Sequence, residues 1–215
     1  MSEEFAIDLV GVTRRFGRET AVDDVTLRVP RGSLCGFVGL NGAGKSTTIR
    51  IAVGLLRATA GSARLAGCDA VRDHVELCRR VGYVPDRPNV YGWMRVGEAI
   101  AFVRKFHAVA WNAARCDDLT RRFRLPLDAR VSKLSKGQAA KLQLLLAVCH
   151  DPQVLILDEP TSGFDPLVRE EFLESVLRVA GEREQTVLFS SHALADVQRL
   201  ADRVAILHEG RLIAH

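Results

Sequence analysis

The 215-residue sequence predicts an α/β fold with a mostly parallel core sheet, an N-terminal antiparallel side sheet and an inserted helical subdomain. Short apolar runs alternate with helical patterns, which is typical of a parallel sheet covered by helices. The first runs have no helix between them, which favours an antiparallel pairing. The stretch from Asp86 to Ser132 has helical spacing and no convincing strand, which favours an inserted helical unit.

The expected strands are the apolar runs bounded by turn residues. They cover residues 6–12, 25–29, 34–38, 154–157, 187–190 and 204–207. The last of them begins a hairpin that turns at Glu209-Gly210 and returns over residues 212–213. An apolar stripe from Val168 to Ala180 predicts a helix that ends at Gly181.

Length and hydropathy predict one domain over residues 1–215. We expect a core subdomain in residues 1–85 and 150–215 and the helical subdomain in residues 86–149. The longest wholly apolar stretch, residues 144–149, is far shorter than the roughly 20 residues of a membrane-spanning helix. The acidic start does not resemble a secretory signal, so we expect a cytoplasmic protein.

Cysteine spacing and charge add two expectations. The five cysteines are scattered, which indicates packing residues instead of a disulfide or zinc framework. The net charge is +4, but residues 101–141 hold ten Lys or Arg and three Asp, so this basic stretch carries +7. Either it is a solvated helical face, or it contacts an acidic partner or anionic lipid headgroups.

A glycine-rich loop follows the apolar run 34–38 and precedes a helical pattern. It matches G-x-x-x-x-G-K-[ST], the phosphate-binding motif of P-loop NTPases. Its backbone N–H groups converge on a phosphate, Lys45 reaches the β- and γ-phosphates, and Ser46 offers an oxygen to Mg²⁺. The expected nucleotide-binding residues here are Gly39, Leu40, Asn41, Gly42, Ala43, Gly44, Lys45, Ser46 and Thr47.

Two carboxylates, Asp158 and Glu159, end the buried run 154–157. At the edge of the predicted sheet they lie beside the phosphate loop. Asp158 is placed to hold Mg²⁺, and Glu159 can orient and deprotonate an attacking water. The alternative is a pair of solvated acidic residues at a strand end.

The segment Leu134-Ser-Lys-Gly-Gln138 resembles the LSGGQ signature of ATP-binding cassette (ABC) ATPases. Five further matches extend this resemblance over almost the whole chain. They are Phe16, Gly-Tyr-Val-Pro at 82–85, Glu-Pro-Thr-Ser-Gly-Phe-Asp at 159–165, His192, and Asp-Arg-Val at 202–204.

The resemblance implies ATP and Mg²⁺ as cofactors and a head-to-tail dimer. Each ATP is then held between the phosphate loop of one subunit and Ser135, Gly137 and Gln138 of the other. A helix opening at this segment would also direct N–H groups and a positive dipole end toward a γ-phosphate. The alternative for Ser135 is a local helix cap.

The resemblance assigns three more residues. Phe16 stacks on adenine, His192 contacts the γ-phosphate and steadies Glu159, and Asp165 crosses the dimer interface. The alternatives are a buried core phenylalanine, a capping or core histidine, and a helix start at Asp165-Pro166.

Three positions depart from the family pattern. Lys136 stands in place of a signature glycine, and Phe164 stands where leucine is commoner. Asp86 occupies the position of the glutamine that links Mg²⁺ and water to the membrane partner, so we expect it to face the metal. Its alternative is a solvated turn aspartate.

We therefore expect the ATPase subunit of a membrane transporter, peripheral on the inner face of the membrane and coupled to a separate permease. The departures at Asp86 and Lys136 look like exporter-type bacterial systems. A non-transport ABC ATPase acting on DNA or ribosomes is the main alternative. The short span between Lys45 and Ser135 leaves no room for a long coiled coil and there is no second cassette, so a nucleic-acid partner is disfavoured. A binding module with little turnover is disfavoured by Glu159 and His192.

Overall fold

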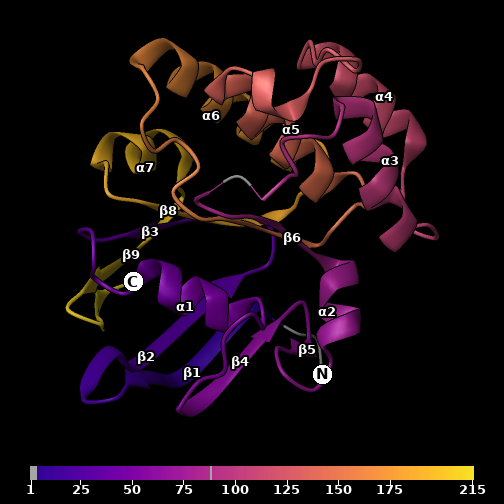
Figure 1. Cartoon of the computed structure of the whole chain (residues 1–215). Helices are drawn as coiled ribbons and strands as arrows, with labels where there is room; N and C mark the ends of the chain where they lie inside the picture. The colour runs from indigo at the N-terminus through magenta and orange to yellow at the C-terminus, as the bar shows by residue number, and fades with distance from the viewer. Residues whose placement is uncertain (1–3, 88) are drawn as a thin grey trace.

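The computed structural model describes residues 4–87 and 89–215, so most of the acidic start lies outside the described residues. Within them, the strands form a six-stranded and a four-stranded sheet. Helix α1 (Lys45–Ala52) lies between the two sheets, and most other helices cover the opposite face of the larger sheet (Figure 1). This α/β architecture confirms the predicted fold class.

The six-stranded core sheet has the order β10-β9-β3-β8-β7-β6, and all neighbours are parallel except β10 and β9. Its strands are β3 (Leu34–Val38), β6 (Val81–Val84), β7 (Val154–Leu157), β8 (Thr186–Ser191), β9 (Arg203–His208) and β10 (Arg211–Ala214). The predicted strands at 34–38, 154–157, 187–190 and 204–207 and the final hairpin are confirmed. Strand β6 was not predicted, because Gly82 interrupts a run of only four residues.

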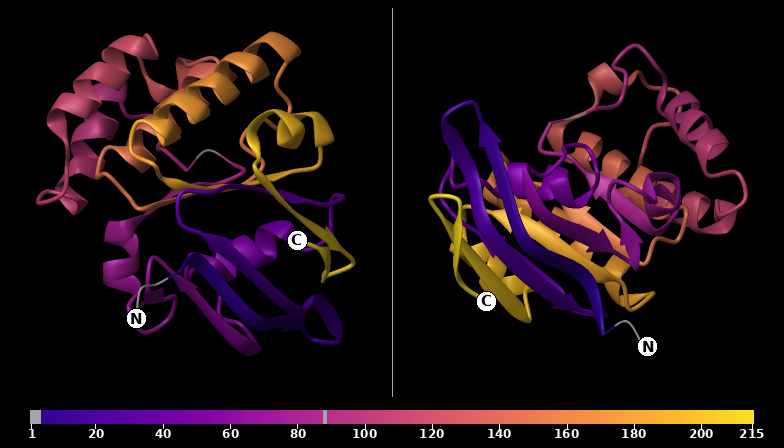
Figure 2. Two further views of the ribbon diagram at one scale, coloured as in Figure 1. Left: turned by 180° about the vertical axis from the view of Figure 1, so that it is seen from behind. Right: turned by 90° about the horizontal axis from the view of Figure 1, so that it is seen from below.

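The four-stranded side sheet is antiparallel, as predicted, with the order β2-β1-β4-β5. Its strands are β1 (Phe5–Phe16), β2 (Glu19–Pro30), β4 (Ala60–Leu65) and β5 (Cys68–Asp69). Strands β1 and β2 extend beyond the predicted ranges. Strand β4 was missed because only Ala63 and Leu65 in it are buried, which leaves almost no apolar pattern to recognise. Figure 2 shows this sheet stacked against the core sheet.

Helices fill the chain between β6 and β7. They are α3 (Val96–Phe106), α4 (Ala113–Arg122), a short 3₁₀ turn (Val131–Lys133) and α5 (Lys136–Val148). The remaining helices are α2 (His74–Arg80), α6 (Pro166–Gly181) and α7 (Leu194–Leu200), and α6 ends at Gly181 as predicted. No helix among the described residues is long and apolar enough to cross a membrane.

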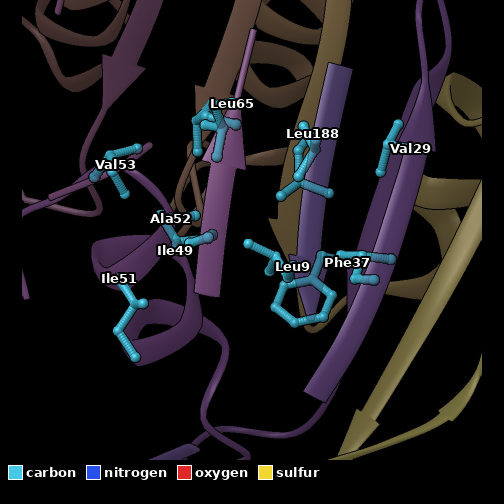
Figure 3. Close-up of a cluster of buried hydrophobic side chains, with 14 of the residues drawn as sticks. Leu9, Val29, Phe37, Ile49, Ile51, Ala52, Val53, Leu65 and Leu188 are labelled. Carbon is cyan, nitrogen blue, oxygen red and sulfur yellow. The ribbon is translucent and has the colours of Figure 1, made fainter. Parts of the chain in front are cut away.

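A hydrophobic core joins the two sheets through α1. Figure 3 shows Phe37 of β3 and Leu188 of β8 facing Leu9 and Leu65 of the side sheet, with Ile49 of α1 beside them. All five are at most 1% exposed. Burying each such side chain stabilises the fold by about 1.5–3 kcal/mol. The core therefore anchors both β3 and α1, which flank the glycine-rich loop.

Ion pairs neutralise part of the basic stretch. Arg115 pairs with Asp151, Lys141 pairs with Glu171, and Arg122 pairs with both Asp118 and Glu182. Three of these four acids lie outside residues 101–141, so the local charge is lower in the fold than the sequence count indicates. The cysteines are all free thiols, and four of the five are buried, as packing residues should be.

We predict that Gly82→Ala destabilises the fold. A Cβ at Gly82 would lie 2.2 Å from the Ala147 carbonyl oxygen, because β6 runs directly against the end of α5. The free energy of unfolding should fall by about 1–3 kcal/mol, measured by urea denaturation. The control is Gly181→Ala, where nothing lies within 4 Å of the added carbon. It should leave stability unchanged or raise it by up to about 1 kcal/mol. Equal urea concentrations at the unfolding midpoint of the two variants would contradict the packing argument.

Candidate functional site

The glycine-rich loop, residues 39–44, is shaped by close backbone approaches. A Cβ at Gly39 would lie 2.4 Å from the Leu207 carbonyl oxygen, and one at Gly44 would lie 2.5 Å from the Ala21 carbonyl oxygen. Gly44 also has a φ of 102°, in the left-handed region that favours glycine. The loop can therefore take this path only with glycine at both ends.

Lys45 opens α1 and is only 5% exposed. Its Nζ donates to the carbonyl oxygens of Gly39 at 2.6 Å and Leu40 at 3.1 Å. Leu40 itself points into solvent. An anionic phosphate is a stronger acceptor for an ammonium group than a neutral carbonyl is. The loop thus positions the buried Lys45 ammonium group beside a helix N-terminus, where both can bind an anion.

Glu159 lies at the centre of the site. Its Oε1 is 3.1 Å from Lys45 Nζ, and its Oε2 is 2.8 Å from His192 Nδ1. Glu159 also has a φ of 47°, a strained value for a residue with a side chain, of the kind that clusters at functional sites. The fold brings together three residues that are far apart in the sequence. His192 is nearly half exposed, so the alternative of a core histidine is wrong.

Asp158 is fully buried at the end of β7. Its Oδ1 accepts hydrogen bonds from Ser46 Oγ at 3.0 Å and Ser190 Oγ at 2.8 Å. Burial raises the pKa of Asp158, the two hydroxyl bonds oppose that rise, and the charge of Asp86 adds to it. The alternative of a solvated strand end is wrong for Asp158.

The second oxygen of Asp158, Oδ2, is buried and has no hydrogen-bond partner. A carboxylate oxygen beside a serine hydroxyl suits a hard divalent cation such as Mg²⁺. Among the described residues, no three His, Cys, Asp or Glu side chains are grouped so as to hold a metal by themselves. Ligand phosphates and water would therefore have to complete the coordination shell, as is usual for Mg²⁺ with nucleotides.

A cavity of about 950 Å³ opens over these residues. Predicted residues that line it, besides Lys45 and Glu159, are Phe16, Asn41, Gly42, Gly44, Ser46, Thr47 and Asp86. Its volume lies within the usual range for a small-molecule site.

Phe16 is 47% exposed, so the alternative of a buried core phenylalanine is wrong. One face of its ring is covered by the Arg14 guanidinium, 4.5 Å from the ring centroid. Such cation–π contacts hold an aromatic ring in place.

Asp86 lines the cavity but already has a cationic neighbour. Its Oδ1 lies 3.7 Å from Arg50 Nη2, and its side chain is about one-third exposed. Its charge raises the pKa of Asp158, so the two carboxylates are close enough to repel. Arg50 partly offsets that repulsion.

Nine predicted residues do not line this cavity. Five of them adjoin residues that do, in the glycine-rich loop or at the strand ends: Gly39, Leu40, Ala43, Asp158 and His192. The other four belong to two helix starts: Ser135, Gly137, Gln138 and Asp165. Ser135 and Gln138 form a capping box at the start of α5, with bonds of 3.1 and 3.2 Å. Asp165 caps α6 by accepting from the Val168 N–H at 3.1 Å. The helix-cap alternatives are therefore confirmed for Ser135 and Asp165.

Ser190 is a site residue that the sequence analysis missed. Its hydroxyl donates to Asp158 and also accepts from the Glu159 N–H at 2.8 Å. It lies at the end of β8, two residues before His192. The sequence did offer a signal for it: a hydroxyl residue ends the apolar run of a predicted strand, shortly before a candidate histidine.

A family model described as ABC transporter matches residues 22–162, which is more than half of the chain. The chain belongs to the ABC transporter family. Two curated relatives illustrate the similarity. The bacitracin transport ATP-binding protein BcrA of Bacillus licheniformis is 34% identical over 96% of this chain and 68% of its own length. The daunorubicin resistance ATP-binding protein DrrA3 of Streptomyces coeruleorubidus is 37% identical over 97% of this chain and 67% of its own length.

A solved structure described as an ATP binding subunit of an ABC transporter superposes with a TM-score of 0.86 at 29% identity. The match covers 97% of this chain and 88% of that one. This similarity confirms the fold expected from the sequence resemblance.

We predict that Ser190→Ala destabilises the chain in the absence of ligand, because it leaves the buried Glu159 N–H without its acceptor and removes one donor from Asp158. The free energy of unfolding should fall by about 1–3 kcal/mol. The pKa of Asp158 should rise further, since a bond that lowers it is lost.

The control is Ser175→Ala on α6, where an exposed hydroxyl donates to the Glu171 carbonyl oxygen. It should change stability by no more than about 0.5 kcal/mol. Urea denaturation measures the free energy of unfolding of both variants. If Ser175→Ala lowered it as much as Ser190→Ala does, the effect would not be specific to the site.

Proposed function

We propose that this chain is the ATP-binding and ATP-hydrolysing subunit of an ABC transporter, and that it powers a separate transmembrane permease as a head-to-tail dimer. The observation that carries the proposal is the convergence of Lys45, Glu159 and His192 beside Asp158 in a chain of this family. In this proposal the chain lies at the inner face of the membrane, where the cytoplasm supplies ATP.

ATP binds in the cavity over the glycine-rich loop. Its phosphates accept hydrogen bonds from the backbone N–H groups of residues 39–47. They also attract the Lys45 ammonium group away from the Gly39 and Leu40 carbonyl oxygens. Adenine stacks on the free face of Phe16, opposite Arg14.

Ser46 and the unpartnered oxygen of Asp158 would hold the Mg²⁺ that accompanies the nucleotide. When bound, the ion neutralises charge on the phosphates. Asp86 lines the same cavity and would add a carboxylate on the side of the ion where Arg50 lies.

Glu159 is the general base for hydrolysis. In the free chain, Lys45 lies at its Oε1 and His192 lies at its Oε2. When the phosphates draw Lys45 away, Oε1 becomes free to accept a proton from the attacking water. His192 keeps the carboxylate oriented during this step.

The second subunit supplies Ser135, Gly137, Gln138 and Asp165. Within one chain these residues lie away from the cavity, at the N-terminal starts of α5 and α6. The N–H groups and the positive dipole ends of these helices are therefore available to a phosphate presented by another copy. Lys136 adds a cation beside them. Its Nζ lies 3.4 Å from the Gly163 carbonyl oxygen of the same chain.

An exposed aromatic cluster is suited to contact the permease. The Tyr91 ring contacts both Trp93 and Phe102, and Phe102 also contacts Phe106. Each of the four side chains is more than one-third exposed. Exposed apolar patches of this kind mark interaction sites. The relatives named for bacitracin transport and daunorubicin resistance favour an exporter as the complete system.

We predict that Glu159→Gln retains ATP binding but lowers turnover by about 100-fold or more, because the amide cannot accept the water proton. Phosphate release by the purified variant measures the effect. The control is Glu184→Gln, at an exposed position outside the site, which should hydrolyse ATP at the unaltered rate. Hydrolysis by Glu159→Gln within a few-fold of that control would remove Glu159 from the mechanism.

We predict that Ser135→Arg, added to Glu159→Gln, abolishes ATP-dependent dimerisation while each chain still binds nucleotide. Its bulk and charge block the face that a partner's ATP would meet. Sizing chromatography with Mg-ATP gives the oligomeric state. Ser132→Arg adds the same side chain three positions earlier, outside the signature, and should remain dimeric. A dimeric Ser135→Arg variant would refute the composite site.

A further inference from the structure

A buried polar cluster lies behind Glu159 and His192, where β8, α6, α7 and the turn after β7 meet. Its centre is Asp196 of α7, which is only 3% exposed. Asp196 Oδ1 accepts from Arg169 Nε at 2.5 Å. Asp196 Oδ2 accepts from Thr161 Oγ1 at 2.9 Å and from Ser191 Oγ at 3.3 Å. One carboxylate therefore joins three other segments of the chain.

Two of these donors lie next to the proposed catalytic pair. Thr161 is in the tight turn that follows Glu159, in which the Ser162 N–H donates to the Glu159 carbonyl oxygen at 3.1 Å. Ser191 directly precedes His192, and its hydroxyl also accepts from the Ala193 N–H at 3.0 Å. His192 thus lies in a turn whose two ends are bonded to each other and to Asp196.

The third donor, Arg169, is on α6, the helix that Asp165 caps. The hydrogen bond and ion pair with Asp196 raise the pKa of Arg169, so the guanidinium stays charged. A buried carboxylate with three donors has little freedom to move, because any shift leaves a charge or hydroxyl without a partner in a low-dielectric interior. The cluster therefore couples the position of α6 to the two turns of the site.

Glu159 needs such a restraint. Its φ of 47° is unfavourable for a residue with a side chain, and such a conformation persists only where the surroundings enforce it. The 2.8 Å contact between His192 Nδ1 and Glu159 Oε2 depends on two turns from different strands keeping their separation. The Asp196 carboxylate is the group that bonds to both turns.

We propose that Asp196 is a positioning residue for ATP hydrolysis, which aligns His192 with Glu159 and relays the position of α6 to them. This inference rests on the proposed function. Asp196 does not line the nucleotide cavity, so it acts through His192 and Glu159 and not on ATP.

The first test compares Asp196→Asn with Arg199→Gln. Asparagine keeps the shape but loses the charge that holds Arg169, so kcat should fall about 10- to 100-fold, the scale of a misplaced catalytic group. The KM for ATP should stay within about 3-fold, because the binding residues are untouched. Arg199 also joins α7 to α6, through Glu170 and Glu174, but it is exposed and touches neither turn. Its variant should keep kcat within about 2-fold.

The second test is a double-mutant cycle with His192→Ala, read as phosphate release over long incubations. If Asp196 acts through His192, Asp196→Asn should lower the rate of His192→Ala by no more than about 3-fold, so that the two losses do not multiply. A general structural defect would multiply them. Thr161→Val removes a single hydroxyl and should lower kcat about 5-fold or more at unchanged KM, which keeps the proposal testable should Asp196→Asn fail to fold.

The outcomes separate this inference from the proposed function. A normal kcat in both Asp196→Asn and Thr161→Val, or losses that multiply with His192→Ala, would overturn the positioning role and leave the proposed function standing. Normal hydrolysis by Glu159→Gln and His192→Ala would overturn the proposed function itself.

Discussion

The parallel pairing of β3, β8 and β7 is the constraint on which the rest of the site depends. It sets the carboxyl ends of three strands side by side, so that Lys45, His192 and Glu159 meet although they lie far apart in the chain. Strand β8, in the middle, also contributes Ser190, which bonds to both carboxylate residues of β7. The apolar contacts between the two sheets hold this edge in place through α1.

The sequence predicted the parts of the site that follow one another along the chain. An apolar run, a glycine pattern and a lysine located β3, the loop and α1. The carboxylates were found because they end a wholly apolar strand, and His192 because of the family resemblance. Ser190 and the Asp196 cluster were not predictable in this way, because most of their bonds join different elements that lie 27 or more positions apart in the chain. Short strands with few buried residues, such as β4, also give no usable pattern.

The signature segment shows why sequence alone could not decide between two roles. Ser135 and Gln138 form a complete capping box, which by itself accounts for both residue types. Gly137 is equally accounted for by packing, since a Cβ there would lie 2.7 Å from Val168 Cγ1. A helix start that is satisfied locally can nevertheless bind an anion, because the caps leave other N–H groups and the dipole free.

The backbone approaches at Gly39 and Gly44 carry a consequence for energy transduction. The loop rests on the Leu207 carbonyl of one sheet and the Ala21 carbonyl of the other, and Lys45 is already folded back into it, so its shape is preorganised before any nucleotide arrives. Ordering this loop would then absorb little of the binding free energy. More of the free energy of ATP binding would then remain for rearrangements elsewhere in the structure, with the loop itself unchanged.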